Sequence, residues 1–249
     1  MMSSVRRPFF TYFGGKWRAA KRYPVPEYDT IVEPFAGSAG YSLRYPHKKV
    51  ILVERDERVA GLWEYLIKAS TLEIASLPDV TLDQTVDDLN VCQEAKWLIG
   101  FWLNKGTSSP CKMPGAWMRS GKHSLNNFWG FGTKMTLASQ VDLIKHWRVI
   151  HGDYSMVPNN TATWFIDPPY KEAGKDYRYG SSKIDYSRLA EWCASRQGQV
   201  IVCENKGADW LPFSHFTDIK GTPGKNRSGV SSEVIWQQNR VLPEWLVLK

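Results

Sequence analysis

The chain has 249 residues, of which 43% are hydrophobic and 23% charged, and its formal net charge is +7 at pH 7. This length suits one substantial domain or a domain with an insertion, and the composition excludes a disordered or fibrous chain. No apolar run reaches membrane-spanning length and the N-terminus has no apolar signal core, so we expect a cytoplasmic protein without membrane contact. The 4 cysteines form no CxxC pair, which predicts free thiols and no metal site.

The first part of the chain predicts alternating strands and helices. A short strand is expected at 30–32, where it runs into the glycine-containing stretch 33–40. A second strand is expected at 50–53 and ends at Glu54, and residues 58–69 carry apolar side chains at helical spacing. This succession predicts the start of an α/β sheet.

The middle of the chain is basic and aromatic. We expect a helix over 83–103, followed by a long irregular stretch at 104–133 that is rich in Gly, Ser, Pro and Asn. From Ala95 through Val141 there is no Asp or Glu, whereas Lys, Arg, Trp and Phe recur. Such segments suit phosphate contacts and base stacking, so a nucleic acid is favoured over the alternative of a solvated basic face with core aromatics.

Strand-like patterns return in the last part of the chain, at 148–150, 163–166, 199–203 and 233–236. We therefore predict one α/β catalytic domain formed by residues 1–60 and 150–249. An inserted, mainly helical domain is predicted at 61–149.

The most informative motif is Asp167-Pro168-Pro169-Tyr170, which follows the apolar strand at 163–166. In open α/β sheets the carboxyl ends of the strands form the ligand-binding edge. The prolines cannot continue a central strand and hold the acid stiffly, and Tyr170 offers a flat face for stacking. The motif therefore suits a planar substrate that bears an amine.

Two further features lie at predicted strand ends. The stretch Phe35-Ala36-Gly37-Ser38-Ala39-Gly40 allows close backbone approach to a ligand, although it lacks the full dinucleotide glycine pattern and a simple turn is the alternative. Glu54 follows at the distance expected of a carboxylate that holds ribose hydroxyls. The alternative for Glu54 is an ordinary solvated acid.

Two weaker motifs complete the set. Tyr12-Phe13-Gly14-Gly15-Lys16 combines close backbone approach with one cation, but it lacks the ending and the strand context of a phosphate-binding P-loop. His151-Gly152-Asp153-Tyr154 places an acid at another strand end, where Asp153 could equally be a helix N-cap.

Taken in order along nearly the whole chain, these motifs resemble the Dam-type (alpha-group) DNA adenine-N6 methyltransferases. The resemblance implies a Rossmann-like S-adenosylmethionine-dependent methyltransferase sheet with an inserted, mainly helical DNA-recognition domain. It also implies S-adenosylmethionine as the cofactor. The cofactor-binding residues would then be Tyr12, Lys16, Phe35, Ala36, Gly37, Ser38, Gly40, Glu54, Asp153, Tyr154 and Asp167. Asp56 is a rival to Glu54, because the family usually has an aspartate in this region.

By the same resemblance, the catalytic residues are Asp167, Pro168, Pro169 and Tyr170, and the substrate is a flipped adenine in double-stranded DNA. We expect a monomer in a bacterial or phage-infected cell. Whether it serves a phage, a restriction–modification system or a chromosome stays open, as does the recognition sequence. The residues expected to contact DNA lie in the insertion and are Lys105, Lys112, Arg119, Lys122, Asn126, Asn127 and Lys134.

Three alternatives remain open from the sequence. A methyltransferase of the same fold could act on RNA or on protein, because the Asp167 motif suits any planar amine. A DNA-binding module could have kept the fold and lost catalysis, although the intact acid argues against it. A nucleotide-dependent oxidoreductase is disfavoured by the missing glycine pattern.

Overall fold

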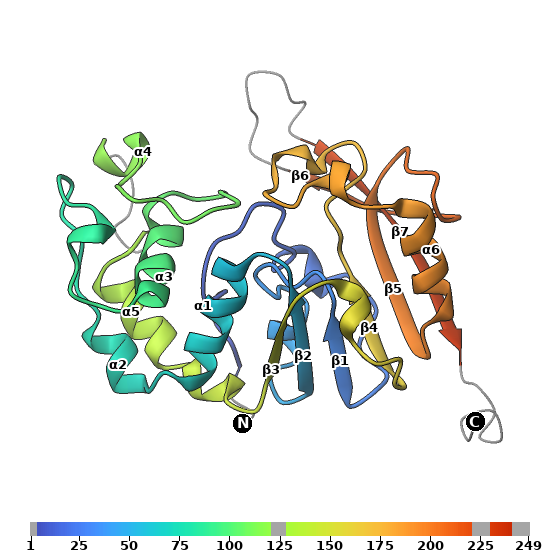
Figure 1. Ribbon diagram of the computed structural model, residues 1–249, viewed down its shortest axis with the longest axis horizontal. Helices are drawn as coiled ribbons and strands as arrows, with labels where there is room; N and C mark the ends of the chain where they lie inside the picture. Colours follow the sequence, from blue (N-terminus) through green and yellow to red (C-terminus); the bar gives the residue numbers. More distant parts are fainter. Residues whose placement is uncertain (1–3, 121–127, 221–229, 241–249) are drawn as a thin grey trace.

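The computed structural model describes residues 4–120, 128–220 and 230–240, and within them seven strands form one sheet (Figure 1). The strand order is β3-β2-β1-β4-β5-β7-β6. Strands β1 to β5 run parallel, whereas β7 is antiparallel to both β5 and β6. The strands are β1 (Thr30–Glu33), β2 (Lys49–Glu54), β3 (Arg148–His151), β4 (Ala162–Ile166), β5 (Gly198–Asn205), β6 (Ser214–Lys220) and β7 (Val230–Arg240).

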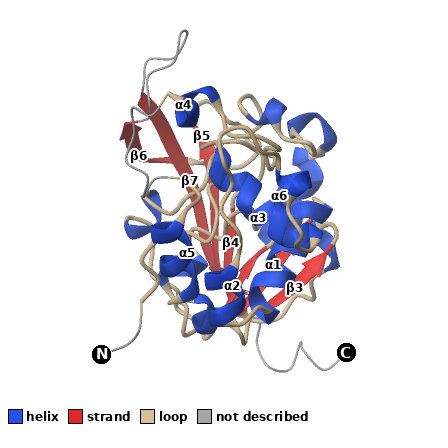
Figure 2. Cartoon of the chain, turned by 90° about the vertical axis from the view of Figure 1, so that its left-hand side faces the viewer, coloured by secondary structure: helices blue, strands red, loops and turns tan. Residues whose placement is uncertain are grey.

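The helices cover the sheet and form a cluster beside it, as Figure 2 shows. The α-helices are α1 (Glu57–Lys68), α2 (Thr71–Ser76), α3 (Gln93–Leu103), α4 (Ala116–Arg119), α5 (Phe131–Ala138) and α6 (Tyr186–Ser195). Short 3-10 turns occupy Ala19–Lys21, Ser42–Arg44, Val86–Asp88, Val141–Ile144, Tyr154–Met156, Gly174–Asp176 and Ser181–Lys183. No helix in the described part of the chain is both long and apolar enough to cross a membrane.

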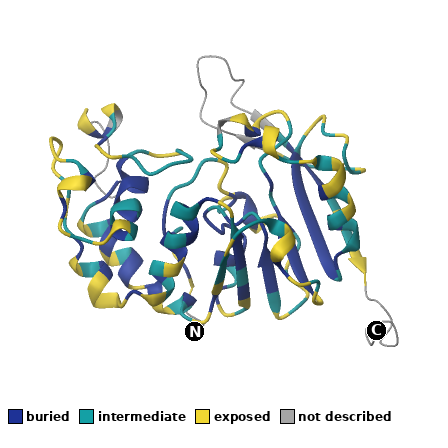
Figure 3. Ribbon diagram, in the orientation of Figure 1, coloured by how far each residue is buried: buried dark blue, intermediate teal, exposed yellow. Residues whose placement is uncertain are grey.

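The central strands β1, β4 and β5 are buried almost throughout, and the edge strand β3 is only half-buried or exposed (Figure 3). Side chains alternate between the faces, so that Ile31 joins one apolar cluster and its neighbour Val32 the other. The first cluster contains side chains of the N-terminal segment, α1 and α3, and the second contains Leu189 and Cys193 of α6. The sheet is therefore a central layer between two packed faces.

The sheet changes direction of growth between β1 and β4. The chain adds β2 and β3 on one side of β1, and then β4 and β5 on the other. Loops leaving β1 and β4 therefore diverge at the carboxyl edge, which is the place where open α/β sheets bind ligands. This strand order, with β7 antiparallel, confirms the expected Rossmann-like methyltransferase fold.

The helices α2 to α5 lie to the left of the sheet in Figure 1, between α1 and β3 in the sequence. They do not form a core of their own, because Trp63 of α1, Phe101 of α3 and Leu137 of α5 belong to the same apolar cluster as the sheet. The expected boundary at residue 60/61 also falls inside α1, which packs on β2 and β3. Helix α1 is thus part of the α/β layer, and the extra helices begin after it.

Some elements differ from the sequence-based expectation. The helix expected from 83 begins only at Gln93, because Thr85 and Asp88 cap a separate 3-10 turn and Cys92 precedes the helix in an extended conformation. Helix α4 and the start of α5 interrupt the stretch 104–133 that was expected to be irregular. The strand at 233–236 is the centre of the longer β7, and β6 was not predicted.

Candidate functional site

A cavity of about 460 Å³ lies at the carboxyl edge of the sheet, where β1, β2 and β4 end. Its size falls within the range of small-molecule sites in proteins. The N-terminal segment and the segment after Asp167 supply further walls. The residues of the predicted cofactor site all line it, namely Tyr12, Lys16, Phe35, Ala36, Gly37, Ser38, Gly40, Glu54, Asp153, Tyr154 and Asp167. The fold therefore brings together motifs that are spread over more than half of the sequence.

Asp167 follows the last residue of β4 and is held by a buried lysine. The Nζ of Lys16 lies 3.0 Å from Oδ1 of Asp167 and 3.5 Å from Oε1 of Glu233. It also donates a hydrogen bond to the Gly14 carbonyl at 3.1 Å. Burial raises the pKa of Asp167 to about 6, although the Lys16 ammonium opposes this rise. Asp167 is consequently ionised at neutral pH but close to its titration range.

The charge of Lys16 is set by its two acidic neighbours. The side chain is 7% exposed, and such burial by itself disfavours the charged ammonium. The carboxylates of Asp167 and Glu233 outweigh this effect and raise the pKa of Lys16. Lys16 is therefore a cation at any physiological pH, and it sits beside the acid that faces the cavity.

The loop after β1 and the acid at the end of β2 are joined by hydrogen bonds. The backbone N–H of Gly37 donates to Oε2 of Glu54 at 3.0 Å, and the N–H of Asp56 donates to Oε1 at 2.9 Å. Gly37 has a φ of 45°, a left-handed conformation that glycine adopts at little cost. Burial raises the pKa of Glu54. The carboxylate is thus held in the cavity wall by the loop itself.

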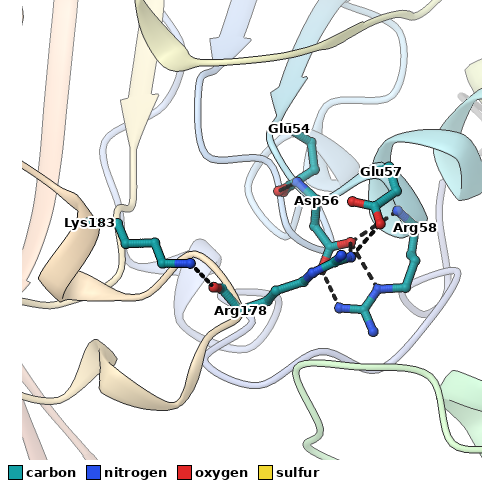
Figure 4. A network of polar contacts seen from close by, with 6 residues as sticks. All are labelled: Glu54, Asp56, Glu57, Arg58, Arg178 and Lys183. Carbon is teal, nitrogen blue, oxygen red and sulfur yellow. Dashed lines mark hydrogen bonds and ion pairs between the residues drawn. The ribbon is translucent and has the colours of Figure 1, made fainter.

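Asp56, the rival to Glu54, has a structural role in this arrangement (Figure 4). It caps α1 by accepting a hydrogen bond from the Arg58 N–H at 3.0 Å, and its Oδ1 also accepts from Nε of Arg58 at 2.9 Å. Burial would raise the pKa of Asp56, but the hydrogen bonds from Arg58 lower it overall. Because its oxygens are engaged by arginine, Asp56 is less available to a ligand than Glu54.

The segment after the Asp167 motif closes one side of the cavity. Arg178 forms ion pairs with Asp56, at 3.5 Å, and with Glu57 at the start of α1 (Figure 4). The hydroxyl of Tyr177 donates to the Phe13 carbonyl at 3.0 Å. The segment is therefore tied both to α1 and to the N-terminal motif.

Aromatic rings form another wall. The ring of Phe35 stacks on that of Tyr154, with centroids 5.3 Å apart and an interplanar angle of 28°. Asp153, beside Tyr154, lines the cavity and also caps the 3-10 turn by accepting from the Ser155 N–H at 3.1 Å. Both interpretations of Asp153 made from the sequence are therefore compatible with its position.

The four residues of the Asp167 motif do not all face the cavity. Asp167 and Pro169 line it, whereas Pro168 is buried. The ring of Tyr170 packs against the first apolar cluster, and the Lys16 ammonium lies 4.7 Å from its centroid. In this structure Tyr170 therefore supports Lys16, and its ring is not among the cavity walls.

The residues expected to contact DNA are in unlike environments. Lys105 and Arg119 are exposed, and Lys112 is exposed and paired with Asp87 at 2.7 Å. Lys134 contradicts the expectation of a surface cation, because it is buried and its Nζ donates to the Leu77 carbonyl at 2.9 Å. The expected contacts Lys122, Asn126 and Asn127 lie outside the described residues.

Three buried groups near the site were not assigned from the sequence. Glu33 ends β1 and lines the cavity, where its Oε1 accepts from the Ser42 N–H at 2.7 Å. Burial raises the pKa of Glu33 to about 8. Glu233 of β7 reaches Lys16, and Tyr23 of the N-terminal segment donates a hydrogen bond to Glu233. Glu33 could have been predicted from the sequence, because it stands directly before the glycine-containing stretch 35–40. The sequence around Glu233 contains no such indication of a site residue.

The described residues contain no cluster of three or more His, Cys, Asp and Glu side chains that could hold a metal ion. No protein-family model matches the chain, and no curated protein matches it. A solved structure that matches is HI0767 from Haemophilus influenzae, a protein provisionally described as a methylase. It is 13% identical, with 85% of this chain and 80% of that chain covered and a TM-score of 0.32. At this level of similarity the match carries no argument about activity.

Proposed function

We propose that this protein is an S-adenosylmethionine-dependent methyltransferase that acts on the exocyclic N6 amine of adenine in double-stranded DNA. The observation that carries the proposal is the position of Asp167. Its carboxylate lines a cavity at the switch point of the sheet, next to a glycine loop and an acid at the end of β2. The order of these motifs along the chain resembles that of the Dam-type enzymes.

The cavity residues fit a nucleoside-like cofactor that carries a positive charge. Glu54 offers a carboxylate for ribose hydroxyls, and the backbone of the loop at 35–40 lies beside it. The stacked rings of Phe35 and Tyr154 offer a flat wall to an adenine base. Asp167 and Asp153 add negative charge to the cavity wall, which favours a sulfonium. S-adenosylmethionine would supply an electrophilic methyl group on a good leaving group.

The residues of this chain would act by positioning and electrostatics. The amine of adenine is a poor nucleophile, because its lone pair is delocalised into the ring. The Asp167 carboxylate would accept a hydrogen bond from that amine and so return electron density to the nitrogen. Tyr177 and Arg178 would limit the entry of water by tying their segment over the cavity.

Double-stranded DNA is the proposed substrate because basic residues lie in the extra helices and in the N-terminal segment. Lys105 and Arg119 are exposed, and so is Arg18 near the start of the chain. Cations of this kind can bind phosphates. A base within a duplex cannot reach a cavity at the sheet edge, so the adenine would have to be flipped out of the helix.

A substrate panel tests the proposal. The full chain is incubated with methyl-labelled S-adenosylmethionine and, separately, with duplex DNA, single-stranded RNA and a protein mixture. We expect label in duplex DNA, recovered as N6-methyladenine after digestion to nucleosides. Label in RNA or protein would replace DNA as the substrate. Cofactor binding without transfer to any of the three would indicate a binding module.

A further inference from the structure

The buried acid Glu233 belongs to the same charge cluster as Asp167, although it lies on a different part of the sheet. Glu233 is 5% exposed and stands in β7, opposite Asn205 of β5. Its Oε1 lies 3.5 Å from Nζ of Lys16. Lys16 thus stands between two carboxylates, with Asp167 at 3.0 Å. One ammonium is shared by two acids, and only Asp167 lines the cavity.

Glu233 is itself anchored from behind. Its Oε2 accepts a hydrogen bond from the hydroxyl of Tyr23. The ring of Tyr23 stacks on Phe216, with centroids 4.6 Å apart, and meets Phe165 edge-on at 5.0 Å. Because Tyr23 is 3% exposed and packed on two sides, the position of the Glu233 carboxylate is determined by the core.

The two oxygens of Asp167 are not equivalent. Oδ1 is buried and is the oxygen that faces Lys16. The Asp167 side chain is nevertheless 19% exposed, and Oδ1 does not contribute to that exposure. An ammonium bound to one oxygen leaves the second with free lone pairs for a hydrogen-bond donor.

We propose that Glu233 is a positioning residue that shares the Lys16 ammonium with Asp167, and thereby keeps the second oxygen of Asp167 free for the amine of the substrate. This role rests on the proposed function, because only a methyltransferase acting on an amine would need the second oxygen of Asp167 as a hydrogen-bond acceptor. Glu233 does not touch the cavity and would act only through Lys16. Without it, Lys16 would have a single acidic partner and would move fully onto Asp167.

The groups that surround Asp167 define what a titration would report. Burial raises the pKa of Asp167, the Lys16 ammonium lowers it, and the Glu233 carboxylate adds a smaller rise. Removing the charge of Glu233 should therefore lower the pKa of Asp167 for two reasons. A carboxylate that repels Asp167 is lost, and the Lys16 ammonium comes closer to Asp167. The charged and titratable groups that face Asp167 from the packed elements are Lys16, Tyr23, Glu33, Tyr170, Tyr177, Cys203 and Glu233.

The test is a pH titration of Asp167 in the full, unliganded chain, followed by ¹³C NMR of labelled aspartate carboxyls. The Asp167 signal is assigned by its loss in Asp167→Asn. We expect a midpoint near 6 in the unaltered protein. In Glu233→Gln the midpoint should fall by about one pH unit. Glu233→Asp keeps the charge at a greater distance and should give a smaller fall, which also serves if Glu233→Gln does not fold.

Glu27→Gln is the matched control. Glu27 also contacts β7, where its carboxylate accepts a hydrogen bond from Asn239, but it is exposed and does not pair with Lys16. The same chemical change there should leave the Asp167 midpoint unaltered. A midpoint in Glu233→Gln that is equal to or higher than that of the unaltered chain would overturn the inference. This readout needs no substrate, so its failure is distinguishable from failure of the proposed activity.

Where methyl transfer is measurable, the kinetics give a second readout. Glu233→Gln should lower kcat roughly tenfold with little change in KM, because the loss is in the orientation of Asp167 and not in binding. The acid limb of the rate profile should move to lower pH, in step with the NMR midpoint. A higher KM with unchanged kcat would contradict a positioning role.

Discussion

The carboxyl edge of the sheet and the extra helices hold their charges in opposite ways. At the edge, Nζ of Lys16 and Oδ1 of Asp167 lie 3.0 Å apart and both side chains are largely buried, so the charge of each shifts the pKa of the other. In the helices, Lys105 and Arg119 are exposed, and Lys112 pairs with Asp87 on the surface. Removing one partner of a buried ion pair destabilises the fold strongly, because the other charge stays buried without a partner. Exposed charges contribute little to the stability of the fold and are screened by salt. The charged groups at the sheet edge are therefore already paired and held in place without a ligand. The exposed cations of the extra helices are accessible to a charged partner in solution.

The largest effect should come from Asp167→Ala. Removing the acceptor from the cavity should lower methyl transfer to duplex DNA by about a thousandfold, because the transition state loses its preorganised acceptor. Label transfer and circular dichroism would be measured together, since Lys16 is left with Glu233 as its partner and the chain should stay folded. Full activity in a folded Asp167→Ala protein would contradict the proposed mechanism.

The next effect separates Glu54 from Asp56. Glu54→Gln should weaken S-adenosylmethionine binding about tenfold to a hundredfold, as expected for the loss of hydrogen bonds to a charged group. Calorimetric titration with the cofactor measures the affinity. Asp56→Asn is the paired variant, and we expect it mainly to loosen the Arg58 and Arg178 contacts. The opposite ranking of the two affinities would assign the ribose to Asp56.

A smaller effect concerns pH and Glu33. Burial raises its folded-state pKa from 4.5 to about 8, so within that interval the unfolded chain loses a proton that the folded chain keeps. Stability from this group is present below pH 4.5 and is lost as pH rises through 8. Urea unfolding from pH 6.5 to 8.5 should show a fall on the order of 2 kcal/mol, which Glu33→Gln removes. An equal fall in both proteins would show that Glu33 is ionised in the folded state.

The smallest effect tests whether exposed and buried lysines of the extra helices differ. Lys105→Gln should weaken DNA binding a few-fold and lower the salt slope by about 1, because one phosphate contact is lost. Lys134→Met should leave the slope unchanged and instead lower the free energy of unfolding by about 1–3 kcal/mol, since the Leu77 carbonyl loses its donor. Fluorescence anisotropy over a salt series, with urea unfolding, measures both.

Much of the site could be predicted because it follows local patterns. Asp167, Glu54 and the loop at 35–40 each come directly after an apolar strand, and parallel strands bring their carboxyl ends to one edge. Their convergence on one cavity therefore follows from the strand pattern once the strand order is known. The assignment of a methyl donor and of adenine came from the family resemblance and stays a prediction.

Other features escaped prediction because they depend on distant partners. Lys134 looked like a surface cation in an acid-free segment, but α5 packs on α2 and turns it toward the Leu77 carbonyl. Tyr170 was expected to face a substrate, and its ring instead lies in the apolar cluster beside Lys16. Glu233 stands in a strand that is antiparallel to its neighbours, so no motif links it to Asp167.

The sequence by itself determined the carboxyl ends of β1, β2 and β4, the order of the motifs and the uneven distribution of charge, because periodicity, proline and glycine act over a few residues. Only the tertiary structure decided which charges are buried together. Lys16 lies between two carboxylates, because β4 ends at Asp167 on one side of it and β7 places Glu233 on the other. The hydroxyl of Tyr23 holds the Glu233 carboxylate in place. Ionisation depends on burial and on neighbours within a few ångströms, and those neighbours come from segments that are far apart in the chain.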